Sequence, residues 1–259
     1  MRALVLDLDG TLLNSNKRIS NRNMAIVERV LEKNILVMIA TARPPRTVRK
    51  LLPSVLQERS LMIYYNGALI EREGIQKHTA IEPDLVQQVC DYVRVNEKSC
   101  WISAEVTDHW VCTEANDYRS LIGVSQNPEQ IDLDLFETLS PTKMLLCHIR
   151  NPQALSEALS HIVAVLHTDK GMLTQLMNRS ATKEAAVSEI TSEKGISLAD
   201  VVVFGDDYND LGLFYQCGYP VAMGNAISEL KAIASEVTSS NDDDGVAVTL
   251  ERILKTMEP

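Results

Sequence analysis

The chain has 259 residues, which is long for one domain and short for two, so a core domain with an insertion is expected. Its 45% hydrophobic and 23% charged residues are typical of a globular protein, and no apolar window is long enough to span a bilayer. The net charge of −10 and the lack of a long basic tract argue against nucleic acid as a partner.

Cysteine and histidine usage argues against a zinc site. The five cysteines include no Cys-x-x-Cys pair, and the five histidines show no metal-ligand spacing. Scattered cysteines are typical of a reducing compartment, and the amino terminus lacks the features of a signal peptide. We therefore expect a cytoplasmic protein with no membrane partner, as a monomer or a small homo-oligomer.

The first eighty residues alternate short apolar runs with helical patterns. Buried strands are predicted at residues 3–6, 35–40 and 61–65. Ser20 is a predicted N-cap of the first helix, which buries Met24 among its apolar side chains, and Asn34 is its left-handed C-terminal residue. Thr41 is expected directly before the second helix. This β-α-β-α-β order predicts a doubly wound parallel sheet.

From about Ala80 the pattern changes to that of a mixed α+β module. Its strands are predicted at residues 100–106, 110–112, 143–149, 162–166 and 172–176, and its helices at 84–95 and 153–161. The polar stretch 114–130 is given no element. The strand-helix alternation returns at Thr182, so the module is predicted to be an insertion into the first domain. The returning elements are helix 182–194, strand 201–204, a helix through Phe214, strand 219–223 and helices 229–234 and 246–254.

Two carboxylates follow the first strand. Asp7 and Asp9 are two apart, so on an extended segment their side chains lean to the same side and converge. Carboxylates that close repel unless a cation lies between them or one keeps a proton. The pattern therefore indicates a metal site, or a nucleophile paired with a general acid. The alternative is a surface turn, because Asp-Gly is a common turn dipeptide.

Thr41 and Lys183 lie at predicted helix starts. A hydroxyl at Thr41, beside free N–H groups at the positive end of a helix, could bind phosphate, although a simple N-cap threonine fits equally well. Lys183 opposes the helix dipole in its first turn, which suggests a functional role, although a solvated lysine is the default interpretation for any single position.

A second acidic pair follows the strand at residues 201–204. Asp206 and Asp210 are four apart and share a face if a helix begins at once, and Gly205 lets the backbone pass close to a ligand. An all-oxygen cluster suits a hard cation such as Mg²⁺. The nearby run Asn241-Asp242-Asp243-Asp244-Gly245 lacks the ligand spacing of a calcium loop and is interpreted as a capped helix start.

These motifs together resemble the haloacid dehalogenase (HAD) superfamily, and more narrowly its Cof-type subclass IIB phosphatases. The resemblance rests on four ordered motifs: Asp7-x-Asp9-Gly10-Thr11, Thr41, Lys183 and Gly205-Asp206-x-x-Asn209-Asp210. The sequence departs from the family at Ala42, where the family usually has glycine. Supporting matches are Asn66-Gly67-Ala68, residues 222–226 and residues 244–246. The resemblance implies a Rossmann-like core at residues 1–80 and 181–259 and an α+β cap of type C2B at residues 81–180.

The resemblance also implies an activity, a Mg²⁺-dependent phosphatase that acts on small phosphorylated metabolites. Asp7 would be the nucleophile that forms an aspartyl-phosphate, and Asp9 the general acid and base. The implied metal ligands are Asp7, the Asp9 carbonyl and Asp206, with Asp210 in support. The implied substrate-phosphate residues are Thr41, Ala42, Arg43, Lys183 and Asn209.

Two other functions stay open at this point. A phosphomutase of the same superfamily would return the phosphoryl group to the sugar. A phospho-accepting signalling module also places carboxylates and a lysine on a parallel sheet, but is about half this length. Polar residues of the insertion such as Tyr118 and His148 could face a substrate, but a structural role is the simpler interpretation. The sequence does not identify the substrate.

Overall fold

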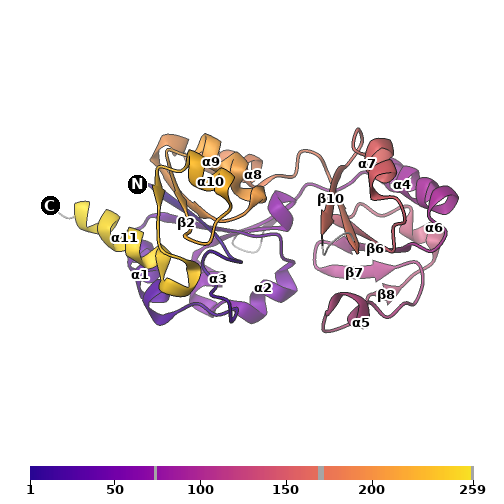
Figure 1. Ribbon diagram of the computed structural model, residues 1–259, viewed down its shortest axis with the longest axis horizontal. Coiled ribbons are helices and arrows are strands. Elements are labelled where there is room, and N and C mark those ends of the chain that lie inside the picture. The colour runs from indigo at the N-terminus through magenta and orange to yellow at the C-terminus, as the bar shows by residue number, and fades with distance from the viewer. Residues whose placement is uncertain (73–74, 169–171, 258–259) are drawn as a thin grey trace. The chain divides into compact units, whose positions relative to one another are not determined.

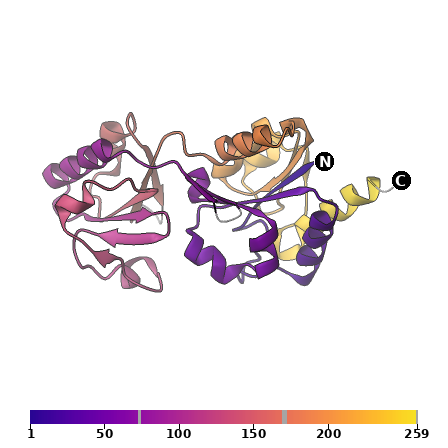
Figure 2. The same cartoon turned by 180° about the vertical axis from the view of Figure 1, so that it is seen from behind.

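The computed structural model describes residues 1–72, 75–168 and 172–257 (Figures 1 and 2). The chain divides into two compact units: Met1–Lys77 together with Thr182–Pro259 forms the first, and His78–Ala181 the second. The domain ranges expected from sequence include residues 73–74, 169–171 and 258–259, which lie outside the described part of the chain. No helix among the described residues is long and apolar enough to cross a membrane.

The first unit is built around one sheet of mostly parallel strands, in the order β14-β13-β12-β1-β2-β3-β4-β5. These strands are β1 (Ala3–Asp7), β2 (Leu36–Ala40), β3 (Leu61–Tyr64), β4 (Leu69–Arg72), β5 (Ile75–His78), β12 (Val201–Gly205), β13 (Tyr219–Ala222) and β14 (Glu236–Val237). Strand β1 has β2 on one side and β12 on the other, so the strand order reverses there. Open α/β sheets bind ligands beyond the carboxyl end of such a strand.

The apolar runs lie where the sequence predicts them. Every residue of β1 and β12 is buried, as expected for strands that are covered by helices on both faces. The register pairs Asp7 with Ala40 of β2 and Leu6 with Phe204 of β12. The segments that follow β1, β2 and β12 therefore begin at the same edge of the sheet.

Helices cover both faces of this sheet. They are α1 (Asn21–Glu32), α2 (Pro45–Leu51), α3 (Ser54–Arg59), α8 (Lys183–Glu193), α9 (Leu211–Gln216), α10 (Ser228–Ile233) and α11 (Gly245–Thr256). Figure 1 shows α8, α9 and α10 together on one side of the sheet and α1, α2 and α3 on the other. Helix α1 packs against α11, and α9 packs against both α8 and α10. The first unit is a doubly wound α/β layer structure.

Three local predictions for this unit need correction. Helix α2 begins at Pro45, so Thr41 lies in a loop before it and is not its N-cap. In α1, Met24 is only half-buried, whereas Asn23 is buried. The Asn23 side chain accepts a hydrogen bond from the Ala247 backbone N–H, which satisfies its oxygen there. The chain also reverses after β3, and β4 runs antiparallel to it, which the sequence pattern does not indicate.

The second unit is a six-stranded sheet with helices, in the order β10-β11-β9-β6-β7-β8. Its elements are α4 (Pro83–Asn96), β6 (Trp101–Val106), β7 (His109–Cys112), α5 (Tyr118–Ile122), β8 (Glu129–Gln130), α6 (Leu133–Phe136), β9 (Lys143–Cys147), α7 (Pro152–Leu159), β10 (Ala164–Thr168) and β11 (Leu173–Met177). All pairings are antiparallel except that of β7 with β8. The predicted fold class, a doubly wound parallel α/β sheet with an inserted α+β module, is confirmed.

The second unit has apolar clusters of its own. Val89 of α4 and Leu155 of α7 are buried with Met144 of β9 in one cluster. Tyr118 is buried in another, in edge-to-face contact with Trp101 at a centroid distance of 5.4 Å. The structural interpretation of Tyr118 therefore holds. The stretch 114–130 contains α5 and β8, which were not predicted from its polar composition.

Candidate active site

Lys183 connects two aspartates at the carboxyl edge of the parallel sheet. Its Nζ lies 2.6 Å from Oδ1 of Asp7 and 2.7 Å from Oδ1 of Asp210, and all three side chains are buried. Asp7 ends β1, Lys183 is the first residue of α8, and Asp210 ends a 3₁₀ turn after β12. Lys183 is therefore not the solvated lysine that its helix position alone would suggest.

Asp210 fixes the loop that follows β12. Its Oδ2 accepts hydrogen bonds from the backbone N–H groups of Asp206 and Asp207, at 3.0 and 3.3 Å. Gly205 is required beside it, because a Cβ at this position would lie 2.6 Å from the Asp210 carboxylate. Both carboxylate oxygens of Asp210 already have partners, so this residue positions the loop and the Lys183 ammonium.

Asp206 lies against the loop that follows β1. Its Oδ1 accepts a hydrogen bond of 2.9 Å from the Thr11 hydroxyl. Gly10 has a φ of +78°, and a Cβ there would lie 2.1 Å from Oδ2 of Asp206. The close approach of two loops thus depends on a glycine in the left-handed region.

The carboxylates carry more negative charge than Lys183 offsets. Burial raises the pKa of Asp7 to about 8, and Asp210 and Asp206 add to the rise while Lys183 opposes it. Burial also raises the pKa of Asp206 to about 6. Burial alone would lower the pKa of Lys183, but Asp210 and Asp7 outweigh it, so this pKa is raised and the lysine stays charged.

Asp9 has different partners from Asp7. Arg43 contacts it twice, with Nε 2.5 Å from Oδ2 and Nη2 2.6 Å from Oδ1, and Lys17 Nζ lies 2.7 Å from Oδ1. Burial would raise the pKa of Asp9, but the hydrogen bonds from Arg43 and Lys17 outweigh it and lower the pKa. The Asp9 carboxylate thus contacts two cations and is not part of the group formed by Asp7, Asp206 and Asp210, and the expected convergence of Asp7 and Asp9 stays a prediction. Strand β1 ends at Asp7, so the alternation of a strand no longer holds at Asp9.

Thr41 and Asn209 lie on two further loops of this edge. The buried Thr41 accepts a hydrogen bond from the Arg43 N–H at its hydroxyl, and its carbonyl accepts one from the Asn66 N–H. Asn209 donates to Oδ1 of Asn66 at 3.0 Å. Ala42 is exposed and lacks a positive φ, so the backbone accommodates its methyl group where the family usually has glycine.

Comparison with known proteins decides the family. A model of the haloacid dehalogenase-like hydrolases matches residues 4–250. The chain belongs to this family. The 5-amino-6-(5-phospho-D-ribitylamino)uracil phosphatase YwtE of Bacillus subtilis (strain 168) is 29% identical over 98% of each chain. The crystal structure of TM0651 from Thermotoga maritima is 26% identical over 97% of each chain, with a TM-score of 0.85.

A further solved structure, the HAD subclass IIB sugar phosphatase BT4131, matches with a TM-score of 0.81 over 98% of this chain and 99% of that one. At 22% identity this likeness bears on the fold alone. The predicted family, fold class and enzyme class, a phosphatase of the HAD superfamily, are confirmed.

The carboxylates of this HAD hydrolase fit a hard divalent cation. Oxygen atoms of Asp7, Asp206 and Asp210 lie within 4.8 Å of one another. All three donors are oxygen, and a cation would favour the ionised forms of Asp7 and Asp206, whose pKa values are raised mainly by burial. Because both oxygens of Asp210 already accept hydrogen bonds, while one oxygen of Asp7 and one of Asp206 have no hydrogen bond among the described contacts, Asp7 and Asp206 are the better direct ligands. Asp9 is predicted at the metal through its backbone carbonyl, and its carboxylate contacts Arg43 and Lys17.

Two residues of this edge were missed as site residues. Asn66, named from the sequence only as a supporting match for the resemblance, accepts a hydrogen bond from Asn209 and has a φ of +54°. An asparagine-glycine pair directly after a buried strand of this sheet is the signal that could have indicated it. Lys17, in a polar stretch after the first motif, bonds Asp9 and had no comparable signal.

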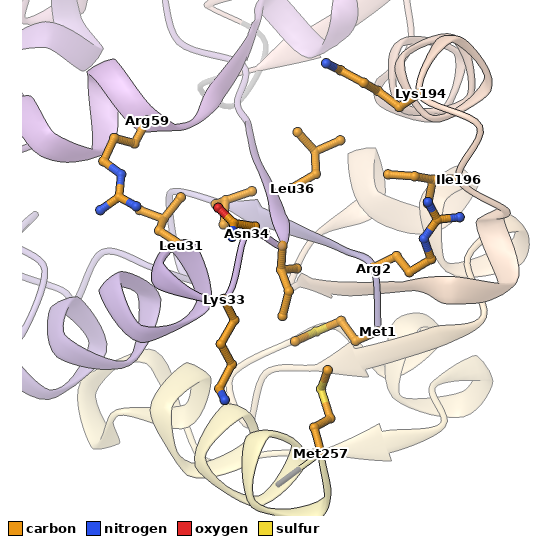
Figure 3. Close-up of a pocket in the computed structure, with 12 residues that line it drawn as sticks. Met1, Arg2, Leu31, Lys33, Asn34, Leu36, Arg59, Lys194, Ile196 and Met257 are labelled. Atoms are coloured by element: carbon orange, nitrogen blue, oxygen red, sulfur yellow. The ribbon is translucent and has the colours of Figure 1, made fainter. Parts of the chain in front are cut away.

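A cavity of about 670 Å³ lies away from these residues. The segments just before β1 and β2 line this cavity, at the edge of the sheet opposite to the carboxylates. Arg2, Lys33, Arg59 and Lys194 lie around it (Figure 3). This cavity is not the chemical site.

Proposed function

We propose that this HAD hydrolase is a Mg²⁺-dependent phosphomonoesterase that acts on small phosphorylated metabolites through an aspartyl-phosphate. The observation that carries the proposal is the buried contact of Lys183 with Asp7, at 2.6 Å, inside a carboxylate cluster at the carboxyl edge of the sheet. A buried carboxylate with a fixed cation beside it can act as a nucleophile towards a phosphoryl group, whose negative charge the same cation offsets.

In the first step, an oxygen of Asp7 forms a bond to phosphorus while the bond from phosphorus to the ester oxygen breaks. Asp9 takes up a proton from solvent once Arg43 has left it for the substrate, and it gives this proton to the departing oxygen. Lys183 and Thr41 hold the phosphoryl oxygens, with Ala42, Arg43 and Asn209 lining the same phosphate site. When the substrate binds, Arg43 would leave the Asp9 carboxylate and contact the substrate phosphate instead.

In the second step, water attacks phosphorus and the bond to Asp7 breaks. Asp9, now ionised, takes the proton of that water. The contacts that lower the pKa of Asp9 in the substrate-free protein favour this ionised form. Asp7 and Asp206 would hold Mg²⁺, with the Asp9 carbonyl as a further ligand and Asp210 in support. The bound ion would offset the repulsion between carboxylate and phosphate.

The substrate class follows from the relatives and stays a proposal. YwtE is named as a phosphatase of 5-amino-6-(5-phospho-D-ribitylamino)uracil, so this compound belongs in a panel with sugar phosphates. We further propose that residues 1–80 and 181–259 form the catalytic core and that residues 81–180 form a substrate-selecting cap of type C2B. A cytoplasmic location and a monomeric or small homo-oligomeric state remain predictions.

Two aspartate variants test the chemistry. With p-nitrophenyl phosphate and Mg²⁺, the wild type should turn over, and EDTA should abolish turnover. Asp7→Asn should remove both turnover and covalent phosphate, because an amide is a poor nucleophile. Asp9→Asn should form some aspartyl-phosphate with this good leaving group and then stall, since the attacking water has no base.

Intact mass after rapid mixing with substrate measures the covalent phosphate directly. Asp84→Asn, an exposed carboxylate in the first turn of α4, is the matched control and should behave as wild type. Turnover that survives complete chelation, or ordinary activity in Asp7→Asn, would refute the proposed mechanism.

A further inference from the structure

Lys17 contacts the Asp9 carboxylate from a loop that carries none of the four motifs. Its Nζ lies 2.7 Å from Oδ1, the same oxygen that Arg43 contacts through Nη2 at 2.6 Å. The Lys17 side chain is 52% exposed and that of Asp9 is 35% exposed. An exposed pair of this kind contributes little to stability, so stability alone does not account for a lysine here.

The backbone of Lys17 has an unfavourable conformation. Its φ is +57°, in the left-handed region that side chains with a Cβ avoid. A tight turn imposes this conformation, because the Lys17 N–H donates to the Asn14 carbonyl and the Asn14 N–H donates to the Arg18 carbonyl. The Asn14 side chain also accepts from the N–H groups of Asn16 and Arg18. Glycine would adopt this φ without strain, so the presence of lysine indicates a role for its side chain at this position.

The run at residues 241–244, near the C-terminus, is hydrogen-bonded to the segment that leads into this turn. Asp242 accepts hydrogen bonds from the N–H and the hydroxyl of Ser15, at 2.8 and 2.6 Å. Asn241 donates to the carbonyl of Leu13 at 2.9 Å, and its contact is buried. A segment that the sequence suggested only as a helix start thus holds the loop between Asp9 and Lys17 in place.

We propose that Lys17, held in the hydrogen-bonded turn at residues 14–18, is a positioning residue for Asp9. The inference rests on the proposed phosphatase function. When Arg43 turns to the substrate phosphate, Lys17 remains as the donor to Oδ1 of Asp9 and keeps the other oxygen, Oδ2, which then carries the proton, directed at the departing oxygen. Proton transfer requires heavy atoms within about 2.6–3.2 Å, so a carboxylate that has lost its second partner transfers less efficiently. Lys17 itself neither gives nor takes a proton.

Leaving-group dependence tests this role. Lys17→Met should lower kcat for an alkyl phosphate by about 10- to 100-fold, since general acid catalysis contributes about 100- to 10,000-fold in enzymes. With p-nitrophenyl phosphate the fall should be about threefold or less, because this leaving group needs little protonation. The alkyl substrate is the one that the wild type hydrolyses fastest among glucose 6-phosphate, ribose 5-phosphate and glycerol 2-phosphate. Lys17→Arg should restore part of the alkyl phosphate rate.

Two further variants separate positioning from folding. Lys17→Gly should keep or raise Tm, because glycine adopts this φ without strain, yet should show the same leaving-group dependence as Lys17→Met. Asn34→Gly is the matched control. Asn34 has the same φ of +57° in the loop between α1 and β2, and the substitution should leave both rates unchanged. In an Asp9→Asn background, Lys17→Met should have no additional effect on the alkyl phosphate rate.

Equal losses with both substrates, an unchanged alkyl phosphate rate, or an additional loss in the Asp9→Asn background would each overturn the inference while leaving the phosphatase function intact. A wild type that hydrolyses none of the phosphate esters would instead refute the proposed function, and the inference with it.

Discussion

At the residue scale, the Lys183 ammonium is the positive charge that holds Asp7 and Asp210 together. The lysine side chain is inaccessible to solvent, as is that of Asp210, and Asp7 is 8% exposed. Removing one partner of a buried ion pair leaves an uncompensated charge, which is far more destabilising than the loss of a surface pair. Lys183 therefore contributes to the fold of the site as well as to its chemistry.

Replacement of Lys183 by methionine should impair both. We expect kcat to fall by about 100- to 1,000-fold, as for loss of a transition-state donor, and stability in EDTA to fall by about 3–5 kcal/mol. Thermal unfolding with and without Mg²⁺ measures the second effect. The double variant Lys183→Met, Asp210→Asn should recover part of the stability and none of the activity. A Lys183→Met protein that is as stable as wild type in EDTA would contradict the buried ion pair.

Stability without metal should decrease as the pH rises. The pKa of Asp7 is 3.8 in its ordinary state and about 8 in the fold, and that of Asp206 rises from 3.8 to about 6. Between these values the folded protein holds protons that the unfolded chain has released, so the free energy of unfolding falls with increasing pH. Because Mg²⁺ binds the ionised carboxylates, it should raise Tm more at about pH 8 than at about pH 5.

Asp7→Asn removes the larger of these two titrations and serves as the control. In EDTA its Tm should change less with pH than that of wild type. A wild-type Tm that rises between about pH 5 and 8 in EDTA would have the opposite sign and would contradict the charge excess of this cluster.

At the element scale, the connection from β12 to α9 carries the acidic pair. Strand β12 ends at Gly205, and the short 3₁₀ turn Tyr208–Asp210 follows, so the predicted helix does not begin at once. Asp206 and Asp210 are brought together by a hydrogen bond from the Asp206 N–H to the Asp210 side chain. The absence of a Cβ at Gly205 gives that side chain its space.

Gly205→Ala should therefore disturb this connection. The new methyl group would displace the Asp210 carboxylate, with a stability loss of about 1–3 kcal/mol, as for other overpacked sites. Because Asp210 also orients Lys183, we expect kcat to fall at least about tenfold. Gly195→Ala is the control, because a Cβ there meets nothing within 4 Å. It should affect Tm through its positive φ and leave kcat unchanged. Wild-type kcat in Gly205→Ala would contradict the tight packing.

At the scale of the whole molecule, the two units have separate cores. All the motif residues come from the first unit, which contains the complete parallel sheet, and the second unit has its own buried clusters. The insertion leaves the first unit after Lys77 and returns at Thr182. The first unit therefore has the chemical groups without any residue of the insertion.

Excision of the insertion tests this division. A chain in which a short Gly-Ser linker joins Lys77 to Thr182 should fold and keep measurable turnover of p-nitrophenyl phosphate. Its kcat/KM for the preferred metabolite should fall by about 100-fold or more, because substrate-orienting contacts are lost. Circular dichroism and the two rates measure these effects. Equal discrimination between the two substrates before and after excision would refute the selecting role proposed for residues 81–180.

The sequence by itself determined the fold class, the insertion and the residues that gather at one sheet edge. Unbroken apolar runs such as residues 3–6 and 201–204 are a local property that identifies buried parallel strands. Once these strands are parallel, the residues that follow them begin at a common edge whatever the remaining contacts are. Asp7, Thr41 and Asp206 could therefore be assigned to that edge from motif order alone.

Only the tertiary structure decided what each of those side chains contacts. Lys183 and Asp7 are 176 residues apart, and Asn209 and Asn66 are 143 apart, so no local pattern encodes these contacts. Beyond the end of β1 the backbone turns, and side-chain direction depends on the partners that other loops supply. The contacts of Asp9 with Arg43 and Lys17 are decided in this way. Periodicity predicts orientation within a strand, whereas in loops long-range hydrogen bonds and ion pairs decide it.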